Sequence, residues 1–263
     1  MHSPSASRLQ PSFRSTRLLM VSSLPPNGLL IAFFQVNTTG AEALCELLRS
    51  LVGATKETVL LDVCCGTGTL GLSLASSVKR LIGIEMCAPA VEDARANAAR
   101  NGITNALFIA KKAEEATLSV LENLSAAEKR SLVAIVDPPR AGLHTDVLKA
   151  LRGCLPLTKI LFVACHAPSF VANSVVLCRP ASKSFLGAPF APTRAYALDL
   201  FPHTQHCELI TVLERPPPQP PQPPQPPQPP PQSSPEPPLK PPFEGGGGGD
   251  GQGGGCSTGS VGA

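Results

Sequence analysis

The stretch Leu61 to Leu72, LDVCCGTGTLGL, decides the fold, because an apolar strand runs through a glycine turn into a helix. The run Val59 to Val63 is suited to a central parallel strand. Gly66 and Gly68 then let the backbone pass close to a ligand, since neither carries a Cβ atom. This stretch predicts a nucleotide-like cofactor at the carboxyl end of a strand.

A second apolar run, Leu81 to Ile84, ends in Glu85 about twenty residues further on. A carboxylate there can accept hydrogen bonds from both hydroxyls of a ribose. Dinucleotides and S-adenosylmethionine both use glycine turns of this kind. The alternative is a glycine turn that only tightens an α/β crossover.

The details favour S-adenosylmethionine as the cofactor. The pattern D-x-x-x-G-x-G lacks the third glycine of the dinucleotide fingerprint. Asp62 lies inside the motif, where a carboxylate would repel a pyrophosphate. A sulfonium cofactor has no phosphate to repel.

Composition divides the 263 residues into three parts. We expect residues 31–215 to form a methyltransferase domain. The segment 216–263 is rich in Pro, Gln and Gly and is expected to be disordered. Residues 1–30 contain arginines and serines without an acidic residue, which weakly resembles a mitochondrial transit peptide. A disordered or atypical start is the favoured interpretation.

Charge and cysteine content limit the function classes. The net charge of +3 is too small for a strong nucleic-acid signal. No apolar run reaches the length of a membrane span, so we expect an intracellular protein, in cytoplasm or nucleus rather than mitochondrion. The nine cysteines contain no paired C-x-x-C motifs, which predicts reduced thiols and no metal site. The oligomeric state is left open.

Helical and strand-like patterns alternate between residues 40 and 215, which predicts an α/β fold with a mostly parallel sheet and helices on both faces. The expected helices are Ala41 to Val52 and Ala88 to Asn101. Further strands are expected at Ala106 to Ile109, Leu132 to Val136, Ile160 to Val163, Ala195 to Leu200 and Cys207 to Leu213. Such sheets bind ligands at the carboxyl ends of their strands.

The strand ending at Val136 continues as Asp137-Pro138-Pro139-Arg140, a rigid and extended turn. In many amino-directed methyltransferases an aromatic ring in the corresponding turn stacks on the base. Arg140 is not aromatic. This argues against an exocyclic amine as methyl acceptor and favours chemistry in which another residue activates the target.

Cys165 supplies that activation, because it follows the strand Ile160 to Val163 at the same rim of the sheet. A thiolate that adds to carbon 6 of uracil makes carbon 5 nucleophilic. Glu208 is the candidate base that removes the proton from carbon 5. The alternative for Cys165 is a small buried core residue without a catalytic role. The alternative for Glu208 is an ordinary carboxylate on an edge strand.

These residues resemble the RNA uracil-5-methyltransferases over about Ala32 to Arg215. The resemblance implies a Rossmann-like S-adenosylmethionine-dependent fold and methylation of carbon 5 of a uridine in RNA, with tRNA as the expected partner. It assigns Cys165 as nucleophile and Glu208 as base. It implies cofactor contacts by Gln35, Glu85, Asp137 and the loop Cys64 to Thr69, including Gly66. The matching segments are AFFQVNT (32–38), LDVCCGTGTLGL (61–72), VDPPRAGLH (136–144), FVAC (162–165) and DLFPHTQHCEL (199–209).

The chain departs from the family pattern at two places. Where the family has S-C-N-P, the chain reads Ala164-Cys165-His166-Ala167. His166 is expected to hydrogen-bond a uracil edge or, when protonated, to lower the pKa of the Cys165 thiol. Little sequence precedes Ala32, so we expect a shortened form that lacks the family's RNA-binding region.

Two rival functions stay open. One is a catalytically impaired, cofactor-binding protein whose proline-rich tail interacts weakly with SH3-like or WW-like domains. The other is an amine-directed methyltransferase that uses Asp137 and needs neither Cys165 nor Glu208.

Overall fold

A computed structural model describes residues 37–215 of the chain. Three predictions fall outside this range: the atypical start at 1–30, the cofactor contact of Gln35, and the disordered tail at 216–263. The domain bounds 31–215 therefore also remain a prediction.

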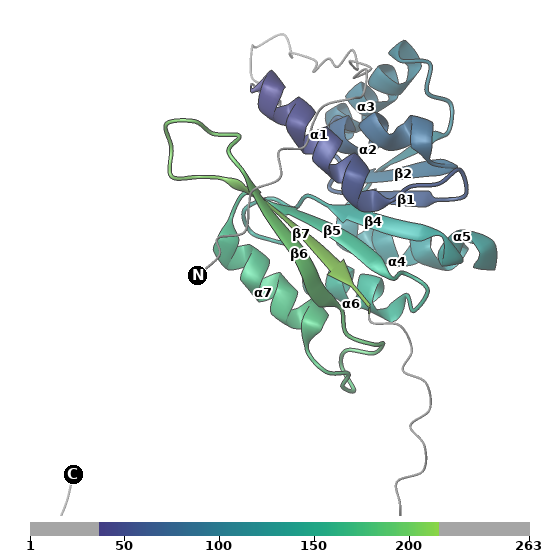
Figure 1. Cartoon of the computed structure of the whole chain (residues 1–263). Helices are drawn as coiled ribbons and strands as arrows, with labels where there is room; N and C mark the ends of the chain where they lie inside the picture. Colours follow the sequence, from purple (N-terminus) through teal and green to yellow (C-terminus); the bar gives the residue numbers. More distant parts are fainter. Residues whose placement is uncertain (1–36, 216–263) are drawn as a thin grey trace, which may run out of the picture. The chain divides into compact units, whose positions relative to one another are not determined.

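Seven strands and eight helical segments alternate along residues 37–215 (Figure 1). The strands are β1 (Val59–Val63), β2 (Arg80–Glu85), β3 (Ala106–Ala110), β4 (Leu132–Val136), β5 (Lys159–Ala164), β6 (Ala191–Leu198) and β7 (Glu208–Glu214). The helices are α1 (Thr38–Val52), α2 (Thr69–Leu74), η1 (Ala75–Ser77), α3 (Ala88–Arg100), α4 (Ala113–Asn123), α5 (Ala126–Arg130), α6 (Thr145–Gly153) and α7 (Ala167–Cys178).

The strands form one sheet in the order β3-β2-β1-β4-β5-β7-β6. Strands β1 to β5 pair in parallel, whereas β7 is antiparallel to both β5 and β6. The predicted mostly parallel sheet is confirmed. β1 lies between β2 and β4, at the centre of the five parallel strands, so the glycine turn opens at the middle of their carboxyl edge.

Two apolar layers enclose the sheet, and β1 contributes to both. Val59, Leu61 and Val63 pack with residues of α4, α6 and α7. Leu60 points the other way and packs with residues of α1, α2 and α3. This alternation follows from the two-residue period of a strand. The expected arrangement of helices on both faces is thus confirmed, and it explains why β1 reads as a continuous apolar run.

Most element boundaries agree with the prediction, and β4 agrees at both ends. Helix α1 begins at Thr38 instead of Ala41, because the Asn37 side chain accepts a hydrogen bond from the Gly40 amide at 2.9 Å and caps the helix. The prediction of a strand at Ala195 to Leu200 is wrong at both ends.

Strand β6 starts earlier, at Ala191, and tolerates Pro192 because it is an edge strand. It stops at Leu198 because the Asp199 carboxylate accepts a hydrogen bond from the Phe201 amide at 3.2 Å and turns the chain. The segment 199–207 is therefore a loop, which reaches the predicted site.

Within residues 37–215, no helix is long and apolar enough to cross a membrane. The eight cysteines of this part of the chain are free thiols. No group of three or more metal-ligating side chains occurs among the described residues.

Candidate active site

The register of the sheet aligns three predicted site residues in one row. Val63 of β1 pairs with Ile84 of β2 and with Val136 of β4. Cys64, Glu85 and Asp137 each come one residue later. Because parallel strands share an edge at their carboxyl ends, these three side chains meet above the sheet. The Asp137 amide donates to the Val63 carbonyl at 3.1 Å and holds this row together.

The glycine loop between β1 and α2 is built from left-handed backbone conformations. Cys64, Gly66 and Gly68 have φ angles of 65°, 54° and 81°. A Cβ atom on Gly68 would lie 3.0 Å from a methyl carbon of Leu72, whereas one on Gly66 would meet nothing within 4 Å. Gly68 is thus required by its backbone and by packing. Gly66 leaves open space on the cavity side of the loop.

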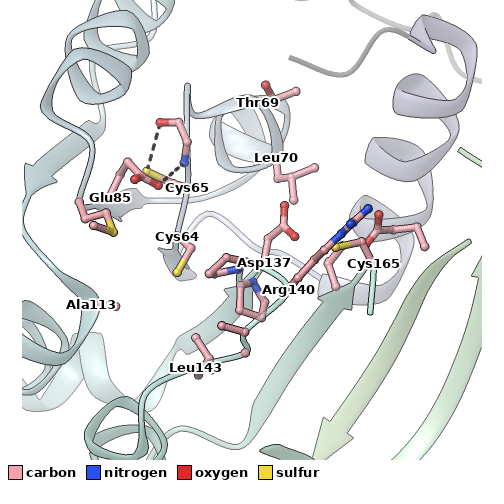
Figure 2. A pocket seen from close by; sticks show the side chains of 18 of the residues that line it. Cys64, Cys65, Thr69, Leu70, Glu85, Ala113, Asp137, Arg140, Leu143 and Cys165 are labelled. Carbon is pink, nitrogen blue, oxygen red and sulfur yellow. Dashed lines mark hydrogen bonds between the residues drawn. The ribbon is translucent and has the colours of Figure 1, made fainter. Parts of the chain in front are cut away.

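Glu85 braces this loop through both carboxylate oxygens. One oxygen accepts a hydrogen bond from the Gly66 amide at 3.0 Å (Figure 2). The other oxygen accepts from the Cys87 amide at 2.9 Å. Each oxygen retains a lone pair for a further donor. The carboxylate is therefore fixed in position and can still accept bonds from ligand hydroxyls.

Asp62 lies elsewhere than the sequence argument assumed. It is fully buried within β1, and its Oδ2 accepts a hydrogen bond from the Gly71 amide of α2 at 3.0 Å. Burial raises its pKa to about 7. Asp62 is absent from the cavity wall formed by the described residues, so it anchors α2 to the sheet instead of repelling a phosphate.

A cavity of about 1120 Å³ opens above this row. Cys64, Gly66, Thr69, Glu85, Asp137, Cys165 and Glu208 all line it. The structure thus brings together every predicted site residue within residues 37–215. Burial, and to a smaller extent Glu85 and Asp137, raise the pKa of Cys64 to about 12. Acidic side chains outnumber basic ones in the lining, and this favours a cationic ligand over a pyrophosphate.

Cys165 lies across from Glu208 because β5 and β7 are antiparallel. Ala164 pairs with Leu209, so continuing the register by one residue puts Cys165 opposite Glu208. Opposite residues of an antiparallel pair project to the same face of the sheet. Cys165 is half-buried, whereas Glu208 is 5% exposed and its Oε1 has no hydrogen-bond partner among the described residues.

The pKa values of Glu208, Asp137 and Cys165 are all raised, with burial as the largest cause for each. Burial raises the pKa of Glu208 to about 7. Burial raises the pKa of Asp137 well above its usual range, and Glu208 adds to this rise. The pKa of Cys165 is raised by burial and by Glu208 and Asp137, while Arg140 lowers it. An uncharged carboxyl group and a neutral thiol are therefore favoured when no ligand is bound.

His166 follows Cys165 directly and lies at the start of α7. Its Nδ1 lies 3.1 Å from Ser169 Oγ and accepts a hydrogen bond from the Ser169 amide at 3.4 Å, so the ring caps the first turn of α7. It does not line the cavity formed by the described residues. The pKa of Cys165 is raised, and the cation that opposes the rise is Arg140. The uracil contact and the thiol activation expected of His166 therefore stay predictions.

Sequence reasoning missed several residues that shape the cavity. Asn173 is buried in α7, where its Oδ1 accepts from the Leu143 amide at 2.7 Å and its Nδ2 donates to the Leu143 carbonyl at 3.3 Å. The sequence signal for Asn173 was an asparagine in the middle of a helix that has no charged residue. Phe201, Thr204 and His206 of the loop before Glu208 also line the cavity. The mistaken strand end at Leu200 obscured their role.

Comparison with known proteins agrees with this geometry. The sequence profile of the family described as tRNA (Uracil-5-)-methyltransferase matches residues 30–216. Human tRNA (uracil-5-)-methyltransferase homolog A is 46% identical over 184 residues, which is 70% of this chain and 29% of that protein. Human homolog B is 46% identical over 188 residues, covering 70% of this chain and 37% of that protein. The chain thus spans about a third of the length of these relatives.

A solved structure supports the fold. The Pyrococcus abyssi tRNA (uracil-54, C5)-methyltransferase, crystallised with S-adenosyl-L-homocysteine, superposes with a TM-score of 0.53 at 32% sequence identity. The match covers 70% of this chain and 40% of that one. The Rossmann-like methyltransferase fold predicted from the sequence is therefore confirmed.

Proposed function

Because the chain belongs to the tRNA (uracil-5-)-methyltransferase family, we propose that it transfers a methyl group from S-adenosylmethionine to carbon 5 of a uridine in tRNA. The whole relatives are named for this activity. The family assignment supports the reaction class, and the cavity chemistry supports the roles of individual residues.

The cavity wall fits the cofactor. Glu85 is fixed by two backbone amides and still has acceptor capacity for a ribose. Met86, which is 68% exposed, and Ala113 offer an apolar surface beside it for a flat base. Asp137, Thr69 and the open side of Gly66 would hold the remainder. When bound, S-adenosylmethionine supplies a methyl group on a positively charged sulfur, which the surrounding carboxylates favour.

Cys165 and Glu208 act at different steps of the reaction on the pyrimidine. The Cys165 thiolate adds to carbon 6, and the electron pair of the carbon 5–carbon 6 double bond makes carbon 5 nucleophilic. After carbon 5 has gained the methyl group, Glu208 removes the proton from carbon 5. The carbon 6–sulfur bond then breaks and releases Cys165. A base with a pKa of about 7 is suited to this transfer at neutral pH.

The observation that carries this proposal is the antiparallel pairing of β5 with β7, which puts a thiol and a buried carboxyl group on one cavity wall. A cysteine that served only as a core residue would not need a base opposite it. An amine-directed enzyme would need neither group.

The test is methyl transfer from labelled S-adenosylmethionine to unmodified tRNA, with cofactor binding measured separately. We expect 5-methyluridine from the unmodified chain and a loss of at least about a thousandfold in Cys165→Ala, whose cofactor affinity stays unchanged. Product from Cys165→Ala at the unmodified rate would favour the amine-directed rival. Cofactor binding without product from the unmodified chain would favour the catalytically impaired protein.

A further inference from the structure

Three arginines, Arg152, Arg179 and Arg215, form an arginine cluster at the edge of the sheet opposite the cavity. Arg152 lies in the last turn of α6, Arg179 directly follows α7, and Arg215 directly follows β7. Because β7 is antiparallel to β5, its end lies beside the start of β5, where Glu214 pairs with Lys159. None of the three arginines lines the cavity formed by the described residues, so the proposed function gives them no role.

The segment 185–190, in the loop between α7 and β6, contacts all three guanidinium groups (Figure 1). The Arg179 guanidinium lies over the Phe185 ring, 3.7 Å from its centroid. The Arg215 guanidinium lies over the Phe190 ring, 4.3 Å from its centroid. The face of an aromatic ring attracts a cation, so these contacts fix the flat sides of both groups. The N–H donors lie in the plane of each guanidinium and stay directed to other partners.

Arg152 contacts the same segment and is fully buried. Its Nη2 atom donates to the Gly187 carbonyl at 3.3 Å, and its Nη1 atom donates to the Val176 carbonyl of α7 at 2.7 Å. Its own carbonyl accepts a hydrogen bond from Arg215 Nη2 at 2.6 Å. Burial, and then the charge of Arg179, lower the pKa of Arg152, and burial and Arg152 lower the pKa of Arg215. The positive charges therefore lie close enough to repel one another.

No acidic side chain balances these charges. Residues 147–198 contain no aspartate or glutamate. Glu214 precedes Arg215, but its carboxylate pairs with Lys159 at 3.4 Å and accepts a hydrogen bond from the Thr193 hydroxyl at 2.8 Å. In the part of the chain that the structure describes, no ion pair joins a carboxylate to the arginine cluster. Buried cations without a counter-charge are unfavourable, which favours a bound anion.

Several N–H donors of the arginine cluster are also buried without a partner. Helix capping accounts for some donors, since Arg215 Nη2 also donates to the Leu151 and Cys154 carbonyls at the end of α6. The atoms left without a partner among the described residues are Nε of all three arginines and Nη1 of Arg215. Arg179 and Arg215 are only half-buried, so the cluster reaches the protein surface.

We propose that the arginine cluster binds an oxyanion of the phosphate type. A phosphate group offers negative charge and several acceptor oxygens, which match the unbalanced charges and the unpaired donors. Two sources supply this chemistry, namely free inorganic phosphate and the phosphodiester backbone of RNA. The site lies away from the cavity and goes beyond the proposed function, so its first test needs no methyl transfer.

The first test compares thermal unfolding of the full chain in sodium phosphate and in sodium chloride of equal ionic strength. Inorganic phosphate at about ten times its dissociation constant should raise the unfolding midpoint by about 3 to 6 °C relative to chloride. Arg179→Met should lose most of this difference, and Arg179→Lys, which keeps the charge but not the planar donors, should keep part of it. Arg130→Met, at the exposed end of α5, is the matched control and should keep all of it.

The comparison is made within each variant, so a lower starting stability of Arg179→Met does not affect it. An equal phosphate response in Arg179→Met and in the unmodified chain would overturn the site. Such a response would reflect only the general stabilisation of folded proteins by phosphate salts. The absence of any phosphate response in the unmodified chain would overturn the site as well.

Binding of unmodified tRNA at several salt concentrations then identifies the source of the anion. If an RNA phosphodiester occupies the site, Arg179→Met should weaken tRNA binding about five- to tenfold and reduce the slope of log affinity against log salt by about one. If free phosphate occupies it, Arg179→Met should change neither quantity while still losing the phosphate response. Both results support the site. A chain that responds to phosphate through Arg179 but does not methylate tRNA would contradict the proposed function and leave the site supported.

Discussion

Burial of Glu208 opposite the nucleophile sets the pH range in which this residue can act as a base. Its pKa is raised from 4.5 to about 7 because the folded protein removes its carboxyl group from water. Below pH 7 the group is mostly protonated and cannot accept a proton. Glu208 can therefore act as a base only at neutral or higher pH. In that pH range the buried charge has a free-energy cost, because it destabilises the folded state.

This cost predicts a pH-dependent effect of Glu208→Gln on stability. The stabilising effect of a raised carboxyl pKa is fully present below the unfolded value of 4.5 and is lost as pH rises through 7. Glutamine does not ionise, so it removes the buried charge. The change in the free energy of unfolding caused by Glu208→Gln should therefore be about 2 to 3 kcal/mol more stabilising at pH 8.5 than at pH 5. Denaturant titrations at both pH values measure this difference. An equal effect at the two values would contradict the buried-charge account.

At the scale of single residues, the sequence predicted which residues gather at the site better than it predicted the direction in which a side chain points. It singled out Glu85, Asp137, Cys165 and Glu208 because each ends, follows or begins a strand at the ligand-binding edge, and all four line the cavity. It misplaced Asp62, since the two-residue period of β1 turns this side chain toward α2 and away from the cavity. The direction in which a side chain points depends on which face of the sheet each helix covers.

At the scale of elements, the loop after β4 depends on α7 for its conformation. Asn173→Ala removes both hydrogen bonds to Leu143 and leaves two buried backbone groups without their partners. We expect a loss of about 1 to 3 kcal/mol of stability and faster hydrogen exchange at the Leu143 amide. Asn123→Ala, at an exposed site on α4, removes a hydrogen bond to Ser119 and should change neither quantity appreciably. Unaltered exchange at Leu143 would show that the loop holds its shape without α7.

Strand ends were predictable where apolar runs meet glycine or proline, and β4 is the clearest case, because Asp137-Pro138 terminates it. β6 was harder to predict because most of its residues are exposed on both faces and therefore show no alternation. Helix α1 began earlier than predicted because its cap uses Asn37, before the apolar pattern starts. Local capping and edge position thus account for the differences.

At the scale of the whole molecule, composition and alternation predicted a mostly parallel sheet but not its strand order. The reversal of β7 between β5 and β6 is a long-range feature that no local period encodes. It is nevertheless the feature that brings Glu208 to Cys165. The residues that line the cavity could be predicted from the sequence. That Glu208 lies opposite Cys165 could be predicted only from the fold or from the family resemblance.

Cofactor binding should stabilise the whole fold, because the cavity is formed by loops from both halves of the sheet. At a concentration a hundredfold above its dissociation constant, S-adenosylmethionine should add about 2.7 kcal/mol, which raises the unfolding midpoint by about 5 to 10 °C. NAD at the same concentration should produce no shift, since its pyrophosphate would lie among mostly acidic side chains. Glu85→Ala should reduce the shift with S-adenosylmethionine. If NAD stabilised the protein instead, the glycine loop would be a dinucleotide-binding loop, which would contradict the account.

The central claim is that Cys165 bonds to the pyrimidine and that Glu208 releases it. The most direct measurement is mass spectrometry of Glu208→Gln after incubation with unmodified tRNA and S-adenosylmethionine, followed by nuclease and protease digestion. The account predicts a methylated uridine attached to the Cys165 peptide, which accumulates because the proton on carbon 5 is no longer removed. Free 5-methyluridine produced by Glu208→Gln at the unmodified rate, without an adduct on Cys165, would contradict it.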